Sequence, residues 1–256
     1  MQYAKQSMRG FMAKKLKVIY YHEVVEEGQG FSYQKIEKEK FARQMAYLQA
    51  QGYETLYFSD LDKPLPPKAV IVSFDDGFRS VYENAAPIME EYGIRGNVYL
   101  PTGYIGNDPH FMDWDMVKKL QEGNFEMQAH THNHVDVRTL DEMALIEQIK
   151  ASDEAFRERL GFLPQAFCLP FGTYDRASVG RLKKTGRYDY ILGSYYGDLR
   201  KTNKGRVLPR IGISNDDTIA DFEAKLEGKR NWKGPLQRLR LFLKNLKKER
   251  ITNYEY

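Results

Sequence analysis

The stretch Ala69-Val70-Ile71-Val72-Ser73-Phe74-Asp75-Asp76-Gly77 is an apolar, β-branched run that ends abruptly in two adjacent carboxylates and a glycine. Such a run is typical of a parallel strand buried on both faces, and side chains at the carboxyl ends of these strands line the active-site face of α/β folds. Consecutive strand side chains point to opposite sides, so Asp75 and Asp76 are expected to differ in task, one binding a cation and the other handling a proton. Taken alone, the stretch also fits a strand that ends in a plain Asx turn.

A cluster of histidines is the second signal. The segment Ala129-His130-Thr131-His132-Asn133-His134 holds three of the five histidines of the chain and follows a strand-like run at residues 125–128. His130 and His134 stand four residues apart, so one helical turn or a tight loop would place both imidazoles on one side, as a shared metal ion requires. A solvated histidine-rich tract is the structural alternative. Three histidines within five residues favour the metal-binding interpretation.

Length and composition set limits on the class of protein. A chain of 256 residues suits one large α/β domain, and its net charge of +4 is too nearly balanced to indicate a nucleic-acid partner. The single cysteine, Cys168, excludes an intramolecular disulfide and is expected to be a small buried hydrophobe, not a nucleophile. No segment is long and apolar enough to span a membrane, and residues 1–17 lack the apolar core of a signal peptide. As given, the chain is therefore expected in the cytoplasm or at the cytoplasmic membrane, and outside the cell if a leader was removed.

Strand-like and helix-like segments alternate along the chain. Helical spacing of apolar residues predicts helices that end near Gly52, Gly93, Gly161 and Gly186, the third beginning with a capping box at Thr139 and Glu142. Roughly seven or eight strands alternating with helices indicate a parallel barrel or a doubly wound sheet, and polar residues at strand ends favour the barrel. The strands are expected at residues 17–24, 53–56, 69–74, 97–100, 125–128, 165–170, 190–193 and 207–211.

The tail has a different composition from the rest of the chain. Residues 232–251 interleave leucines and a phenylalanine with arginines and lysines, which predicts a basic amphipathic helix. This helix either packs on the domain with a solvated basic face or attaches to an anionic membrane surface. The expected organisation is a flexible segment at residues 1–16, a barrel domain at 17–230 and the C-terminal helix within 231–256.

Three motifs in order resemble those of the polysaccharide deacetylases of carbohydrate esterase family 4. They are Ser73-Phe74-Asp75-Asp76-Gly77, the histidine segment at residues 130–134, and Leu169-Pro170-Phe171-Gly172. The resemblance covers most of residues 17–215 and implies a distorted (β/α) barrel of seven or eight units. It also implies a divalent metal bound by the second aspartate and the two outer histidines, with the first aspartate as general base. In this chain the ligands would be Asp76, His130 and His134 and the base Asp75, while His132 would point elsewhere and the backbone N–H of Phe171 would contact substrate.

Two departures from the common family pattern concern the proton donor and an arginine. The usual late histidine is absent, because no histidine follows His134. Tyr21-His22-Glu23-Val24 and Leu208-Pro209-Arg210-Ile211 are similar instead to segments of the circularly permuted poly-N-acetylglucosamine deacetylases, which makes His22 the candidate acid. A strand-end histidine bonded to a carbonyl is the alternative for His22. Cys168 stands where many relatives carry an arginine that orients the base, and Arg210 is the candidate to supply that guanidinium and to line the substrate site.

The resemblance implies a metal-dependent hydrolase that removes N-acetyl groups from N-acetylglucosamine-type residues of a polysaccharide or lipid-linked glycan. Two imidazoles and one carboxylate suit zinc, although cobalt, nickel and iron accept the same ligands. An O-acetyl esterase, a hydrolase of non-sugar amides and a catalytically inactive glycan-binding barrel are the alternatives. A glycan partner and a monomeric state are expected, with contact to a membrane through the tail as the further partner.

Overall fold

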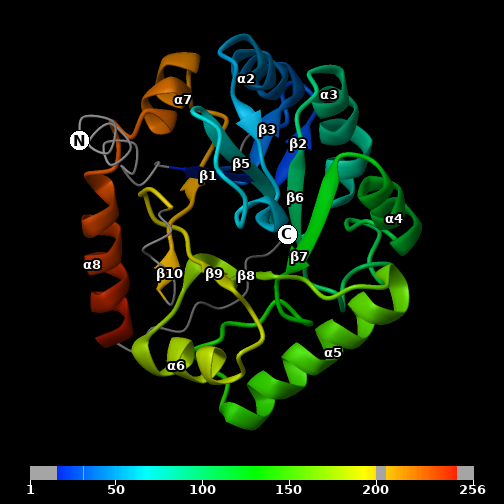
Figure 1. The fold of residues 1–256 in the computed structure, drawn as a ribbon, viewed down its shortest axis with the longest axis vertical. Coiled ribbons are helices and arrows are strands. Elements are labelled where there is room, and N and C mark those ends of the chain that lie inside the picture. The colour runs from blue at the N-terminus through cyan, green and yellow to red at the C-terminus, as the bar shows by residue number, and fades with distance from the viewer. Residues whose placement is uncertain (1–15, 31, 200–205, 247–256) are drawn as a thin grey trace, which may run out of the picture.

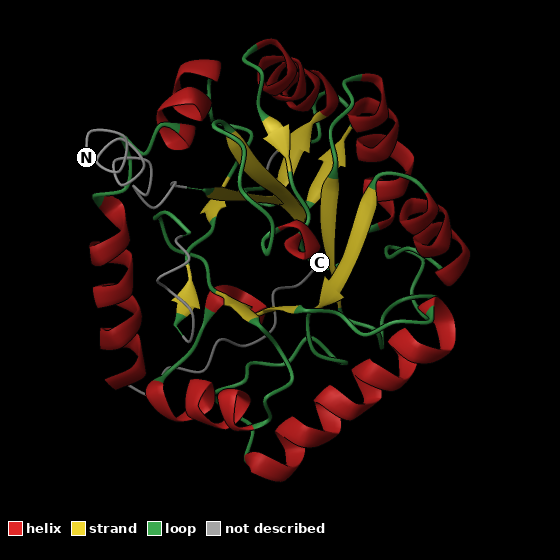
Figure 2. Ribbon diagram, in the orientation of Figure 1, coloured by secondary structure: helices red, strands yellow, loops and turns green. Residues whose placement is uncertain are grey.

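The structure, a computed structural model, describes residues 16–30, 32–199 and 206–246, and in these ranges a curled parallel sheet is surrounded by helices (Figures 1 and 2). The order of strands across the main sheet is β10-β9-β8-β7-β6-β5-β1-β11, with β4 paired beside the start of β5. All of the strand pairs in this sheet are parallel, and β2 and β3 form a second, two-stranded sheet. The strands are β1 (Lys17–Tyr21), β2 (Glu23–Val25), β3 (Lys35–Glu37), β4 (Glu54–Thr55), β5 (Ala69–Phe74), β6 (Gly96–Leu100), β7 (Phe125–Ala129), β8 (Ala166–Cys168), β9 (Tyr190–Leu192), β10 (Val207–Leu208) and β11 (Ile211–Gly212).

The two ends of the main sheet meet in one short segment of chain. β10 pairs with β9 and β11 pairs with β1, and these two strands are separated by only Pro209 and Arg210. Proline has no N–H to continue a ladder, which explains why one predicted strand appears as two. Counting this segment once, seven strand positions curl into the distorted barrel, which confirms the predicted fold class.

Helices cover the outer face of the sheet (Figure 2). β5 is buried along its whole length, as its unbroken apolar run predicts. Alternate residues of the strands face inward, where Val18, Ile71, Tyr99, Cys168 and Leu208 belong to one buried cluster. The helices are α2 (Lys38–Ala50), α3 (Ala86–Glu91), α4 (Trp114–Glu122), α5 (Glu142–Leu160), α6 (Arg176–Lys184), α7 (Ile219–Leu226) and α8 (Lys233–Leu246), with single turns at η2 (Phe58–Asp60), η3 (Val81–Ala85, π-helical) and η4 (Pro170–Gly172).

The structure corrects two local predictions and adds two elements. The strand predicted at residues 17–24 breaks at His22, where the chain leaves the barrel and continues in the small sheet as β2. The predicted capping box at Thr139 and Glu142 is wrong, because α5 begins after Asp141, whose carboxylate accepts a hydrogen bond from the N–H of Ala144. The elements β3 and α7 were not predicted from the sequence.

The two chain ends lie partly outside the described residues. The predicted flexible segment at 1–16 is outside them except for Leu16, which forms a bridge with Leu199. The predicted tail helix is described as α8 up to its end at Leu246. Among the described helices, none combines the length and the apolar character that crossing a lipid bilayer requires.

Candidate active site

Asp75 and Asp76 leave β5 in different directions. Asp75 continues the inward-facing series of Ile71 and Ser73, whereas Asp76 has a left-handed backbone with φ of 68°. Gly77 follows with φ of 71°, and a Cβ at this position would lie 2.9 Å from Leu100 Cδ2. Glycine is therefore needed for the turn that separates the two carboxylates, and both aspartates stay buried.

Asp76, His130 and His134 converge on one point. Asp76 Oδ1 lies 3.2 Å from Nε2 of His130 and 3.2 Å from Nε2 of His134, and all three side chains are buried. Neither contact has hydrogen-bond geometry, so Asp76 Oδ1 is a buried oxygen without a hydrogen-bond partner. Thr131 and His134 have positive φ angles of 64° and 48°, so a tight loop, rather than a helical turn, brings the imidazoles together. The point on which these three ligand atoms converge is where a metal ion would bind.

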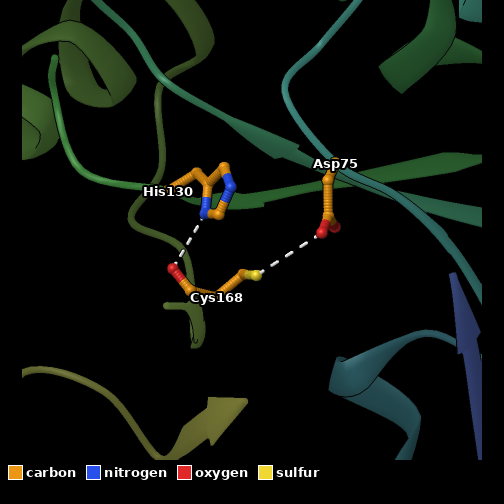
Figure 3. A group of neighbouring side chains, drawn as sticks. All are labelled: Asp75, His130 and Cys168. Carbon is orange, nitrogen blue, oxygen red and sulfur yellow. Dashed lines mark hydrogen bonds between the residues drawn. The ribbon is translucent and has the colours of Figure 1, made fainter. Parts of the chain in front are cut away.

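The hydrogen bonds of this cluster also suit a metal. His130 Nδ1 lies 2.8 Å from the carbonyl oxygen of Cys168 (Figure 3). Burial opposes the charge of this imidazole, but the groups around it, Asp76 among them, raise the pKa of His130 well above its ordinary value. A bound cation would replace the proton on Nε2, while the N–H of Nδ1 would stay on the carbonyl. Burial opposes the ionisation of Asp76, but the neighbouring charge of His134 contributes to holding the pKa of this carboxyl well below its ordinary value. A carboxylate and two imidazole nitrogens are thus available as ligands, and these residues fit a divalent ion.

Arg210 holds Asp75 in a buried two-point ion pair. Its two terminal nitrogens lie 2.5 Å and 2.8 Å from the two carboxylate oxygens, and Arg210 is only 1% exposed. The guanidinium carbon also stands 4.4 Å from the ring centroid of Tyr20 and 5.1 Å from that of Tyr99. Burial opposes the ionisation of Asp75, yet the guanidinium lowers the pKa of this carboxyl below its ordinary value. The predicted neighbourhood of Arg210 and Asp75 is therefore present, and any effect of Arg210 on substrate would pass through Asp75.

Cys168 lies under Asp75 and His130 (Figure 3). Its thiol is buried, its Sγ is 3.8 Å from Asp75 Oδ2, and burial raises the pKa of the thiol. The ligand atoms of Asp75, His130 and Cys168 also lie within 4.8 Å of one another. This second group is a poorer metal site, because Arg210 already holds both oxygens of Asp75 and the thiol stays protonated. Cys168 is thus a buried packing residue, as predicted.

His22 and Phe171 border the same region. His22 follows β1 in the inward-facing series, is half-buried, and its charge contributes to lowering the pKa of both Asp75 and Asp76 after the larger effects named above. A hydrogen bond from His22 to a backbone carbonyl was the alternative to its role as a proton donor. Within the described residues, the His22 ring makes no such bond. Phe171 has φ of 60°, and its ring centroid lies 4.5 Å from that of His134. His132 turns away to Thr102, 2.9 Å from its hydroxyl.

Two rings that flank Arg210, those of Tyr20 and Tyr99, were not among the predicted site residues. A usable signal was present, because Tyr20 lies two residues before His22 and so faces the same side of β1. Tyr99 faces the barrel interior from β6 in the same way. The fold and this cluster together define a parallel α/β barrel with a buried aspartate–histidine centre suited to a divalent metal.

Comparisons with known proteins identify the family of this barrel. The polysaccharide deacetylase family matches residues 62–190, just over half of the chain. The chain is 27% identical over 178 residues to the poly-beta-1,6-N-acetyl-D-glucosamine N-deacetylase of Staphylococcus aureus, an alignment that covers 64% of this chain and 60% of that protein. The present chain therefore spans less than two thirds of that relative.

Solved structures share the fold. The Streptococcus pyogenes deacetylase PplD, in complex with acetate, has a TM-score of 0.77 at 18% identity over 84% of this chain and 99% of its own. IcaB from Ammonifex degensii has a TM-score of 0.71 at 23% identity, with 84% of this chain and 97% of that chain covered. The chain belongs to the polysaccharide deacetylase family and is a hydrolase of this class. His22 and Arg210 lie outside the matched residues, so their place beside the centre comes from the tertiary structure.

Proposed function

We propose that the protein is a metal-dependent N-deacetylase acting on N-acetylglucosamine-type residues of a glycan. The observation that carries this proposal is the convergence of Asp76, His130 and His134 on one point beside an ionised Asp75. The similarity to the Staphylococcus aureus enzyme, named for poly-β-1,6-N-acetyl-D-glucosamine, supports the sugar class. The position of His22 directly after the first strand, and of Arg210 between the last two strands, supports a circularly permuted order of the barrel.

Amide hydrolysis needs a strengthened nucleophile, stabilisation of the oxyanion and a proton for the departing amine. A divalent ion held by Asp76, His130 and His134 would lower the pKa of a bound water and polarise the acetyl carbonyl. The ligand set favours zinc, and cobalt, nickel and iron are the other candidates.

Asp75 is proposed as the base that takes the proton of the attacking water. Arg210 fixes both of its oxygens and lowers the pKa of the carboxyl, so Asp75 is ionised but weakly basic. A base this weak needs a water that the ion has already acidified.

Two further residues complete the proposed mechanism. The backbone N–H of Phe171 would donate to the oxyanion from the turn beside His134, and a cavity of about 240 Å³ opens next to this residue. His22, half-buried beside both carboxylates, would donate a proton to the amine. The base, the oxyanion donor and the proton donor are thus each assigned to a residue near the proposed metal site.

The test is an assay of acetylated glycans with added zinc or cobalt, with free amine and acetate both measured. Asp75→Asn should retain metal and lose about 10²- to 10⁴-fold in turnover, the range of a general base. Asp76→Asn should lose both metal and activity, and full metal occupancy in this variant would contradict the ligand assignment. Acetate without new amine would indicate an O-acetyl esterase, and no turnover with bound glycan would indicate an inactive binding barrel.

A further inference from the structure

The C-terminal helix α8 attaches to the barrel through its polar side. Gln237 Oε1 accepts a hydrogen bond from the N–H of Tyr196 at 2.8 Å, and Asn245 Nδ2 donates to the carbonyl of Tyr174 at 2.9 Å. Gly234 approaches so closely that an added Cβ would stand 2.1 Å from the Tyr196 carbonyl oxygen. Gln237 and Asn245 are eight residues apart and Gly234 is three before Gln237, so the three lie on one helix face. On this face, α8 contacts the barrel through side-chain hydrogen bonds and through the close packing of its backbone at Gly234.

Away from these contacts, α8 presents an apolar ridge to solvent, and two of its residues, Leu239 and Phe242, also line an open cavity between α8 and α6. Five of the nine large hydrophobic residues exposed in the described part of the chain lie on this helix or just before it. Their spacing of three, four and seven residues places most of them along one stripe. An amphipathic helix of a globular domain normally buries this stripe, so α8 has the reverse orientation. The ridge consists of Trp232, Leu236, Leu239, Phe242 and Leu243, exposed by 65%, 43%, 52%, 56% and 48%.

Positive charge surrounds this ridge. Residues 228–248 contain eight lysines or arginines and no aspartate or glutamate. Arg240 and Lys244, four residues apart, are exposed along one border, and Arg238 is exposed on the other, beside the ring of Tyr195. A helix with an apolar stripe, cations along its borders and a tryptophan at one end has the composition of helices that lie in the interface of an anionic bilayer.

We propose that α8 docks flat on an anionic lipid surface, with the ridge inserted at the interface and the bordering cations at the headgroups. A second copy of this chain is a poorer occupant, because pairing two ridges would bring two uniformly basic helices together. The helix stands at the edge of the molecule, clear of the central sheet, where a flat surface can reach it (Figure 1).

Docking would also place the candidate active site near the lipid. The cavity beside Phe171 is lined on its other side by Arg240 and Lys244 of α8. A docked helix would therefore hold this cavity, and Phe171 with it, close to the headgroups, which favours a glycan presented at the membrane. This consequence rests on the proposed deacetylase function, whereas docking itself does not.

The test is sedimentation of the full chain with vesicles of phosphatidylcholine alone or of phosphatidylcholine with about 30% anionic phosphatidylglycerol. Binding is expected to the anionic vesicles and not to the neutral ones. Arg240→Gln with Lys244→Gln should weaken binding about 25-fold, because each interfacial cation contributes roughly fivefold. Leu236→Ser with Leu243→Ser should abolish it. Lys118→Gln on α4 and Met143→Ser on α5, both at exposed positions, are the matched controls and should bind like the wild type.

Fluorescence gives an independent readout. The chain has two tryptophans, so in a Trp114→Phe background the emission of Trp232 should shift to the blue and resist quenching when anionic vesicles are added. Equal binding to neutral vesicles, or an unchanged Trp232 signal, would overturn the proposal. Concentration-dependent dimers that Leu236→Ser with Leu243→Ser dissolves, without vesicle binding, would assign the ridge to a second copy instead. Vesicle binding needs no substrate, and turnover of soluble oligomers tests the enzyme separately.

Discussion

The buried ion pair of Asp75 and Arg210 makes a quantitative prediction. Arg210→Met removes the guanidinium and leaves the Asp75 carboxylate, 4% exposed, without its partner. Loss of one partner of a buried pair typically costs about 3–5 kcal/mol of unfolding free energy. The guanidinium also loses its contacts with the rings of Tyr20 and Tyr99, so we expect a loss near the upper end, about 5 kcal/mol.

A double-mutant cycle separates the interaction energy of Asp75 and Arg210 from the contacts that each residue makes with its surroundings. Asp75→Asn combined with Arg210→Met removes both charges, so its loss should fall short of the sum of the single losses by at least about 2 kcal/mol. Arg187→Met is the matched control, because Arg187 and Asp153 form a similar two-point pair at 2.6 Å and 2.8 Å. We expect this control to lose stability while keeping its turnover at temperatures below unfolding.

Urea unfolding gives the free energies, and a metal-supplemented deacetylation assay gives turnover. An Arg210→Met variant as stable as the wild type, or strictly additive losses in the cycle, would refute a buried ionised pair. Equal turnover in Arg210→Met and Arg187→Met would refute the role of Arg210 in orienting Asp75.

Three further outcomes follow from the structure. His22→Ala should keep its metal and lose about 10²- to 10⁴-fold in amide turnover, with a much smaller loss on an activated acetyl ester, whose leaving group needs no proton; equal losses would exclude a proton donor. Gly77→Ala should cost at least about 2 kcal/mol in urea unfolding, because the backbone is left-handed and the new Cβ meets Leu100, whereas Gly161→Ala, at a similar φ of 77° with open space, should cost about 1 kcal/mol. Asp141→Ala should cost about 1 kcal/mol of unfolding free energy through loss of the α5 cap, and Glu142→Ala almost nothing. A larger loss in Glu142→Ala than in Asp141→Ala would favour the capping box of Thr139 and Glu142 instead.

Much of the local structure is readable from the chain. The unbroken apolar run before Asp75 determined a strand buried on both faces, and glycines such as Gly52 and Gly161 marked the ends of helices. These features depend on side-chain periodicity and backbone conformation within a few residues, which local sequence specifies. Where two polar residues compete to cap a helix, as Thr139 and Asp141 do, the path of the preceding loop decides.

The identities of the charged residues and their places at strand ends were set by the sequence alone, because strand alternation and turn chemistry are local. Their convergence was decided by the tertiary structure. Arg210 meets Asp75 across 135 residues only because the last segment of the sheet lies beside β1. The side of α8 that contacts the barrel was decided in the same way, since an amphipathic pattern predicts a helix but does not specify which face its neighbours cover.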